Sequence, residues 1–160
     1  MEIVNRIHRA TKEIIGDEHW ENIEKLFVAF SRFEHGLIET GFIHDNQVSA
    51  DWHGFSQEIS DVFRLDSSET LQAACNYILD NPPWTRRNGN WIPTPLRGEY
   101  HCWNILYYVK TVRNNLFHGS KYPFAPERDN GLITSCLVIL DYCMAIAPPE
   151  VQEKIWEEFD

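Results

Sequence analysis

Three side chains within one short stretch, Arg113, Asn114 and His118, have the chemistry to act together on a phosphate. A histidine transfers protons near neutral pH, and an arginine can stabilise the charge that develops on phosphate oxygens. Asn114 and His118 are four residues apart, so they share one face of a helix and the amide can orient the imidazole. A histidine before a helix-terminal glycine is also a common cap contact, favoured in its protonated form by the helix dipole.

The helix expected to carry these residues runs from about Glu99 to His118 and is closed by Gly119. One row of its residues recurs at steps of four and three, the spacing of a packed seam: Cys102, Leu106, Val109, Arg113 and Leu116. Arg113 is the charged member of this seam, and burial of an unpaired guanidinium costs several kcal/mol. Three explanations remain open: an ion pair with a core acid such as Glu34, a half-exposed place at a dimer seam, or a phosphate contact.

Apolar residues recur at helical spacing along most of the chain, without sustained strand-like alternation. We therefore expect an all-α fold, an up-and-down bundle of about five main helices. The expected helices cover about 17–40, 50–64, 68–80, 99–118 and 127–147. Asp17 is expected to cap the first and Ser67 or Ser68 the third, and Gly41 to end the first. Pro148 and Pro149 should stop the fifth helix before a short acidic one, and residues 2–15 fit a peripheral helix.

The segment from Asn81 to Gly98 interrupts the helical pattern with four prolines and an Asn-Gly-Asn turn. It interleaves aromatic and basic residues, as a protein that stacks RNA bases and contacts phosphates would: Trp84, Arg86, Arg87, Trp91 and Arg97. The alternative is that both tryptophans fold back as anchors of a long loop. Lys110 and Lys121, on either side of the Arg113–His118 stretch, are expected to contact phosphates.

The overall composition fits one domain over residues 1–160, with its core at about 17–147 and peripheral segments at 1–16 and 148–160. The net charge of −10 argues against nucleic-acid binding by the whole surface. Residues 71–130 nevertheless hold seven Lys and Arg against four acids, a local excess that can bind a phosphate backbone. Chance clustering of charge in a loop explains the same excess equally well.

The four cysteines lack metal-ligand spacing, so reduced, buried thiols and no metal or cofactor are expected. No stretch approaches the roughly 20 uninterrupted apolar residues of a membrane span, and the first residues do not form a secretory signal. A cytoplasmic protein without a membrane partner is expected.

The Arg113–Asn114–His118 set at the end of the penultimate major helix resembles the motif of the HEPN superfamily. The similarity extends to Val112–Gly119, Lys121–Tyr122 and Arg128–Asp129, and to Phe30–His35 and Ala50–Trp52 in the first half. It covers most of the chain from about residue 20 to residue 145.

This resemblance implies a four- or five-helix bundle that forms a homodimer, with the two motifs meeting in one composite cleft. Many members are metal-independent endoribonucleases of toxin–antitoxin and phage-defence systems, whose partners are an RNA substrate and an antitoxin or other regulatory protein. Carried over by position, Arg113 and His118 would be catalytic, Asn114 would support them, and Glu34 matches an acidic position near the motif. Other members are non-catalytic modules that bind nucleotide, RNA or a partner protein, and this alternative remains open.

Overall fold

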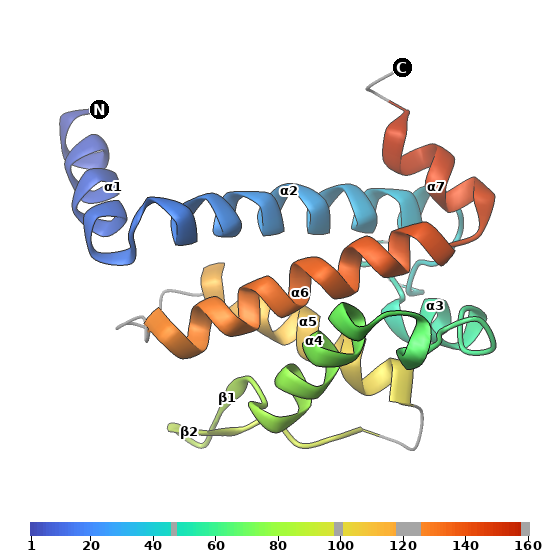
Figure 1. The fold of residues 1–160 in the computed structure, drawn as a ribbon. Helices are drawn as coiled ribbons and strands as arrows, with labels where there is room; N and C mark the ends of the chain where they lie inside the picture. Colours follow the sequence, from blue (N-terminus) through green and yellow to red (C-terminus); the bar gives the residue numbers. More distant parts are fainter. Residues whose placement is uncertain (46–47, 98–100, 118–125, 158–160) are drawn as a thin grey trace.

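The core of the molecule lies around α6 (Pro126–Ile146), which packs between α2 (Asp17–Glu39) and α4 (Glu69–Asp80). Apolar side chains on the inner side of α6 are completely or almost completely buried: Leu132, Ile133, Cys136, Ile139, Leu140 and Cys143. In Figure 1, α2 and α6 run in the same direction, and α5 (His101–Phe117) runs in the opposite direction behind them. The computed structural model describes residues 1–45, 48–97, 101–117 and 126–157.

Over these described residues the chain forms seven α-helices, one 3₁₀ turn and one two-stranded hairpin, which confirms the all-α class. The remaining elements are α1 (Glu2–Ile15), α3 (Trp52–Glu58), the 3₁₀ turn (Leu65–Ser67), β1 (Trp84–Arg87), β2 (Asn90–Pro93) and α7 (Pro149–Trp156).

Two expected helix boundaries are confirmed by their caps. The Ser68 side chain accepts a hydrogen bond from the Leu71 amide at 3.0 Å and starts α4. At the end of α2, Gly41 has a φ of 92°. The Phe42 amide bonds back to the Leu37 carbonyl and the Gly41 amide to the Ile38 carbonyl, which is a Schellman motif.

Three elements differ from the expectation. The N-cap of α2 is Gly16, and Asp17 is the first residue of the helix, where its carboxylate pairs with Lys12 of α1 at 3.2 Å. The helix expected at 50–64 ends at Glu58, and Ile59 and Phe63 enter the core from turns.

The third difference is the hairpin, which occupies part of the segment expected to be a loop. β1 and β2 pair antiparallel, with Trp84 opposite Pro93 and Arg86 opposite Trp91. The connecting residues Asn88 and Gly89 both have positive φ, at 49° and 83°, which is typical of a two-residue hairpin turn.

Over Glu127–Ile146, α6 is long and apolar enough to cross a membrane by length and composition alone. Half of that stretch is buried against α2 and α4. α6 therefore behaves as the core helix of the bundle. The four cysteines are free and buried, as expected.

Candidate functional site

The α5 seam faces the inside of the protein. Cys102, Leu106 and Val109 are at most 5% exposed, and they belong to the same core as residues of α2, α4 and α6. Arg113 and Leu116, nearer the end of the helix, are half-buried. The apolar members of the seam therefore stabilise the protomer itself, and the row reaches the surface at Arg113.

Arg113 is held by an aromatic ring and an amide. Its Cζ lies 5.1 Å from the centroid of the Phe30 ring of α2, within range of a cation–π interaction. Its Nη1 donates a hydrogen bond to Asn114 Oδ1 at 3.1 Å. Asn114 thus orients the guanidinium, and its predicted contact with His118 falls outside the described residues.

Glu34 belongs to the same cluster through the ring that supports Arg113. Phe30 stacks on the buried Trp52 of α3, with centroids 4.8 Å apart and an interplanar angle of 24°. Trp52 Nε1 donates to Glu34 Oε1 at 3.1 Å. Of the catalytic candidates in described segments, Arg113 and Asn114 are in direct contact, and Glu34 is linked to them through the Phe30–Trp52 pair.

His118 and Lys121 lie outside the described residues. The other predicted RNA contacts lie on described residues. Lys110 is half-buried one turn before Arg113. Trp84, Arg86 and Arg87 lie on the hairpin.

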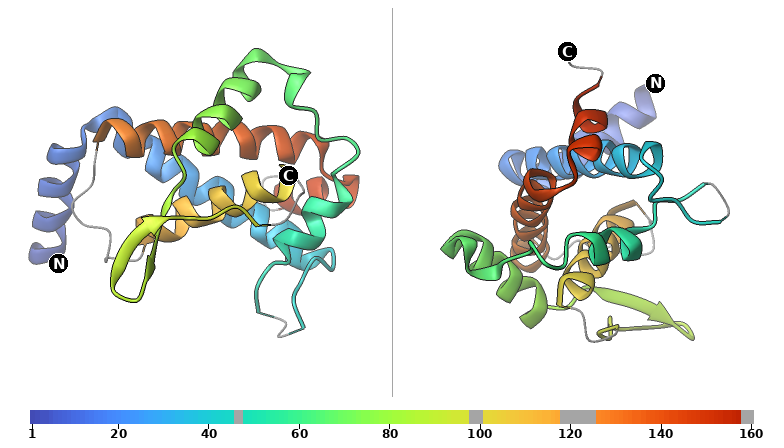
Figure 2. Two further views of the ribbon diagram at one scale, coloured as in Figure 1. Left: turned by 90° about the horizontal axis from the view of Figure 1, so that it is seen from below. Right: turned by 90° about the vertical axis from the view of Figure 1, so that its right-hand side faces the viewer.

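The hairpin is fastened to the motif end of α5. The Asn115 side chain donates to the Trp84 carbonyl at 2.8 Å. From the first turn of α6, Arg128 Nη2 donates to the Pro82 carbonyl at 2.7 Å. The Arg128 guanidinium also lies 5.9 Å from the Trp84 ring centroid. The end of α5, the start of α6 and the hairpin therefore lie at one end of the molecule (Figure 1 and the left view of Figure 2).

The strand register sorts the hairpin residues onto two faces. Alternate residues of a strand point to opposite sides, and directly paired residues share a side. Trp84 and Arg86 are therefore on one face together with Trp91, the partner of Arg86. Arg87 is on the other face with Asn90. Trp84, Arg86 and Arg87 are exposed, and Trp91 is half-buried. The sequence predicted that aromatic and basic residues alternate in this segment, and the strand register shows which of them share a face.

A second aromatic group on α5 was missed by the sequence interpretation. The Arg97 guanidinium lies 4.4 Å from the Tyr107 ring centroid. Tyr107 is 5.5 Å from Trp103, whose ring meets His53 of α3 edge-on at 5.0 Å. Trp103, Tyr107, Lys110 and Asn114 recur at steps of four, three and four, so they form one half-buried stripe beside Arg113. That spacing was visible in the sequence.

Among the described residues, no group of three His, Cys, Asp or Glu side chains is arranged to hold a metal ion. Burial raises the pKa of Cys75 and of Cys102 to about 12, and it raises the pKa values of Cys136 and Cys143 further. These thiols are therefore protonated core groups at neutral pH.

Comparison with protein-family models, curated proteins and solved structures gives no match to this chain. The family assignment therefore stays a prediction from the motif residues.

Proposed function

We propose that this protein is a metal-independent endoribonuclease of the HEPN type, acting as a homodimer in a bacterial toxin or phage-defence system. The observation that carries the proposal is the position of Arg113, half-buried at the end of α5 over Phe30 and hydrogen-bonded to Asn114. An arginine fixed from two sides places its charge at a defined point, as stabilisation of a charged phosphorane requires.

In the proposed reaction, the ribose 2′-oxygen attacks the adjacent phosphorus and the bond from phosphorus to the 5′-oxygen breaks. The products are a 2′,3′-cyclic phosphate and a 5′-hydroxyl. His118 moves protons, which leave the 2′-hydroxyl and are delivered to the 5′-oxygen. Arg113 stabilises the charge on the non-bridging oxygens, and Asn114 positions Arg113.

The hairpin face with Trp84, Arg86 and Trp91 favours single-stranded RNA as the substrate. Tryptophan rings stack on bases and the arginine contacts the backbone. Asn115 fastens this hairpin to the helix that carries Arg113. Bound RNA would therefore lie next to the proposed catalytic residues, and Lys110 would add a phosphate contact.

The test compares wild type with Arg113→Ala and His118→Ala on a set of RNAs in the presence of EDTA. Arg64→Ala serves as the matched control, because Arg64 is exposed and its backbone contacts the Tyr142 hydroxyl near the far end of α6. We expect cleavage by wild type and by Arg64→Ala, and at least a hundredfold loss in both motif variants with unchanged circular dichroism. Absence of cleavage by the wild type on every RNA would contradict the enzymatic proposal.

One observation favours the second candidate, a non-catalytic module that binds nucleotide, RNA or a protein. The ring under Arg113 is part of the core, because Phe30 is 1% exposed, so the arginine also contributes to packing. This candidate gains if Arg113→Ala unfolds the protein while the folded wild type binds RNA without cleaving it.

A further inference from the structure

The N-terminal helix α1 packs with its polar side and exposes its apolar side. Ile3, Ile7 and Ile14 lie on one face of the helix, at steps of four and seven residues. They are 74%, 61% and 63% exposed, and no residue of α1 is buried in the described part of the chain. An amphipathic helix is stabilised when its apolar face is buried, but the isoleucine face of α1 is exposed to solvent in the protomer.

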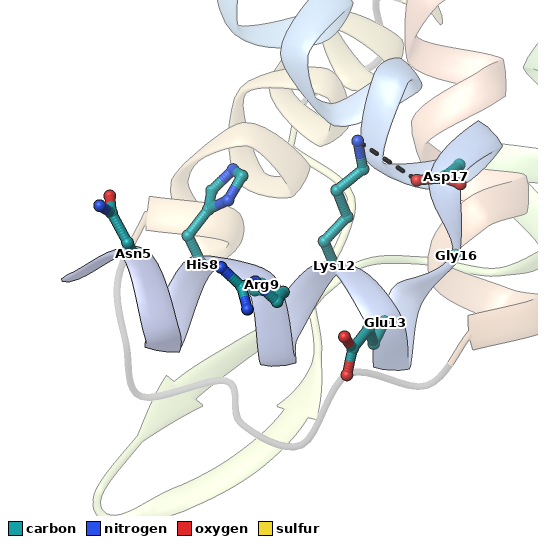
Figure 3. Close-up of a pocket in the computed structure, with 7 residues that line it drawn as sticks. All are labelled: Asn5, His8, Arg9, Lys12, Glu13, Gly16 and Asp17. Atoms are coloured by element: carbon teal, nitrogen blue, oxygen red, sulfur yellow. Dashed lines mark ion pairs between the residues drawn. The ribbon is translucent and has the colours of Figure 1, made fainter. Parts of the chain in front are cut away.

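The polar side of α1 makes the contacts with α2. Lys12 reaches Asp17 at 3.2 Å (Figure 3), and the His8 ring meets the Trp20 ring edge-on at 4.8 Å. The polar hollow between the two helices has a volume of about 520 Å³. These contacts hold α1 out from the end of the bundle (Figures 1 and 2). By helical spacing, the isoleucines lie on the other side of α1 from His8 and Lys12.

A mostly apolar groove lies elsewhere on the same chain, between α2 and α6 and bounded by α7 and the start of α4. Its volume is about 990 Å³. The apolar side chains that line it include Val28, Leu71, Leu137, Val138, Met144 and Ile155. A groove of this kind accommodates the apolar face of an amphipathic helix.

The α1 helix cannot fill the groove of its own chain without losing helix. α1 ends at Ile15 and α2 begins at Asp17, so Gly16 is the whole connection. Two antiparallel helices packed side by side need a connection of about two to five residues. The groove starts at Glu21, close to this junction, and would require such an antiparallel return. A helix from another copy has no such restriction.

The charges also favour a second copy. Residues 1–15 carry three basic residues and two acids, a net charge of +1, while the rest of the chain carries −11. At the groove, Lys25 is paired with Glu21 at 2.7 Å, and Arg32 donates to the Ile155 carbonyl at 2.8 Å. Glu24 and Asp141 also line the groove. Arg6 lies beside the isoleucine row of α1, so with the isoleucines inward it would meet these carboxylates on a partner copy.

We propose that α1 of one copy docks in the α2–α6 groove of a second copy, with Ile3, Ile7 and Ile14 inward. When each chain donates its helix to the other, the contact is a closed two-fold exchange. The occupant is a second copy instead of a lipid surface, because the groove is complementary to α1 and the acidic body repels anionic headgroups. The proposal rests on the homodimer of the proposed function and names the contact that holds it, and its tests measure self-association without RNA cleavage.

Light scattering on the full chain provides the first test. Wild type is expected at twice the chain mass. Ile7→Glu on α1 and Val28→Glu in the groove are each expected to weaken association at least tenfold and to give monomers. Both positions are more than half exposed in the protomer, so these substitutions leave its fold intact. Asn5→Glu, on the opposite side of α1 from Ile7, adds the same charge and should leave the dimer unchanged.

Cross-linking gives the second test. The four native thiols are buried, so cysteines introduced at the surface react first. An Ile7→Cys chain mixed with a Val28→Cys chain should form a disulfide-linked heterodimer under mild oxidation. A monomeric wild type overturns the proposal, as does an Ile7→Cys chain that links only to itself. The proposal is also overturned if wild type binds vesicles of anionic phospholipid through Ile7 and does not self-associate.

Discussion

At the scale of single residues, Arg113 is both a member of a core-facing row and a half-buried charge. The sequence singled it out through that row, since four of the five seam residues are apolar. The sequence could not choose between an ion pair, a dimer seam and a phosphate contact, because that choice depends on other elements. The structure supplies Phe30 from α2 and Asn114 from the next position of α5.

Replacement of Arg113 by lysine tests whether the planar guanidinium matters beyond its charge. Arg113→Lys keeps the positive charge but loses the fork of donors and the flat contact with Phe30. We expect the free energy of unfolding to fall by about 0.5–1 kcal/mol, the size of an exposed cation–π interaction, and RNA cleavage to fall at least tenfold. Urea denaturation and the EDTA cleavage assay measure the two effects. A lysine variant as active as wild type would show that charge alone suffices.

The buried thiols make stability depend on pH at the alkaline end. The unfolded chain ionises its cysteines near pH 9, whereas burial keeps Cys75 and Cys102 protonated to about pH 12. The unfolded state therefore binds fewer protons above about pH 9, and the free energy of unfolding falls as the pH rises. The limiting slope is about 1.4 kcal/mol per thiol for each pH unit.

Urea denaturation between pH 7 and pH 10.5 checks this dependence. Cys136→Ala, which removes one buried thiol, should show a shallower decline than wild type. Equal slopes for the two proteins would contradict the assignment of the decline to the thiols.

At the scale of elements, the hairpin is the part that the sequence interpretation failed to predict. Its strands have four residues each, too few to show alternation, and the prolines around them suggested a loop. Asn88-Gly89 was a readable hairpin signal because both turn residues need positive φ. The helices were predictable because their apolar periodicity is long and their caps are local, as Ser68 and Gly41 illustrate.

The hairpin register predicts unequal roles for two adjacent arginines. Arg86 shares a face with Trp84 and Trp91, and Arg87 is on the opposite face. If single-stranded RNA stacks on the tryptophan face, Arg86→Ala should weaken binding about five- to tenfold and Arg87→Ala by less than twofold. Each variant removes one positive charge, so each controls for the other. Fluorescence anisotropy with a labelled single strand measures both. Equal losses would indicate unspecific attraction by charge.

Close packing of α4 on α6 depends on a glycine. A methyl group at Gly131 would overlap the hydroxyl and ring of Tyr77. Gly131→Ala should therefore destabilise the protein by about 1–3 kcal/mol through overpacking, although alanine alone would favour the helix. Thermal denaturation of Gly131→Ala, Tyr77→Ala and the double variant forms a mutant cycle. Purely additive effects would show that the two positions do not interact.

At the scale of the whole molecule, the elements proposed to bind and cleave RNA lie at one end. The hairpin meets the end of α5 and the start of α6 there through Asn115 and Arg128, which lie 31 and 46 residues along the chain from their partners. Local pattern predicted the all-α class and the candidate residue types. It could not predict this convergence, or that α1 turns its apolar side to solvent, because both depend on how separate elements pack against one another.

The chemical nature of the RNA ends produced in EDTA tests the central claim most directly. Mass spectrometry of the fragments from wild-type protein should show 2′,3′-cyclic phosphates and 5′-hydroxyls. A substrate with 2′-deoxyribose at the cleaved position should stay intact, because the attacking oxygen is missing. His118→Ala should yield neither product at a measurable rate. Fragments with 5′-phosphates and 3′-hydroxyls, or cleavage of the deoxy substrate at the same position, would contradict an Arg113–His118 ribonuclease.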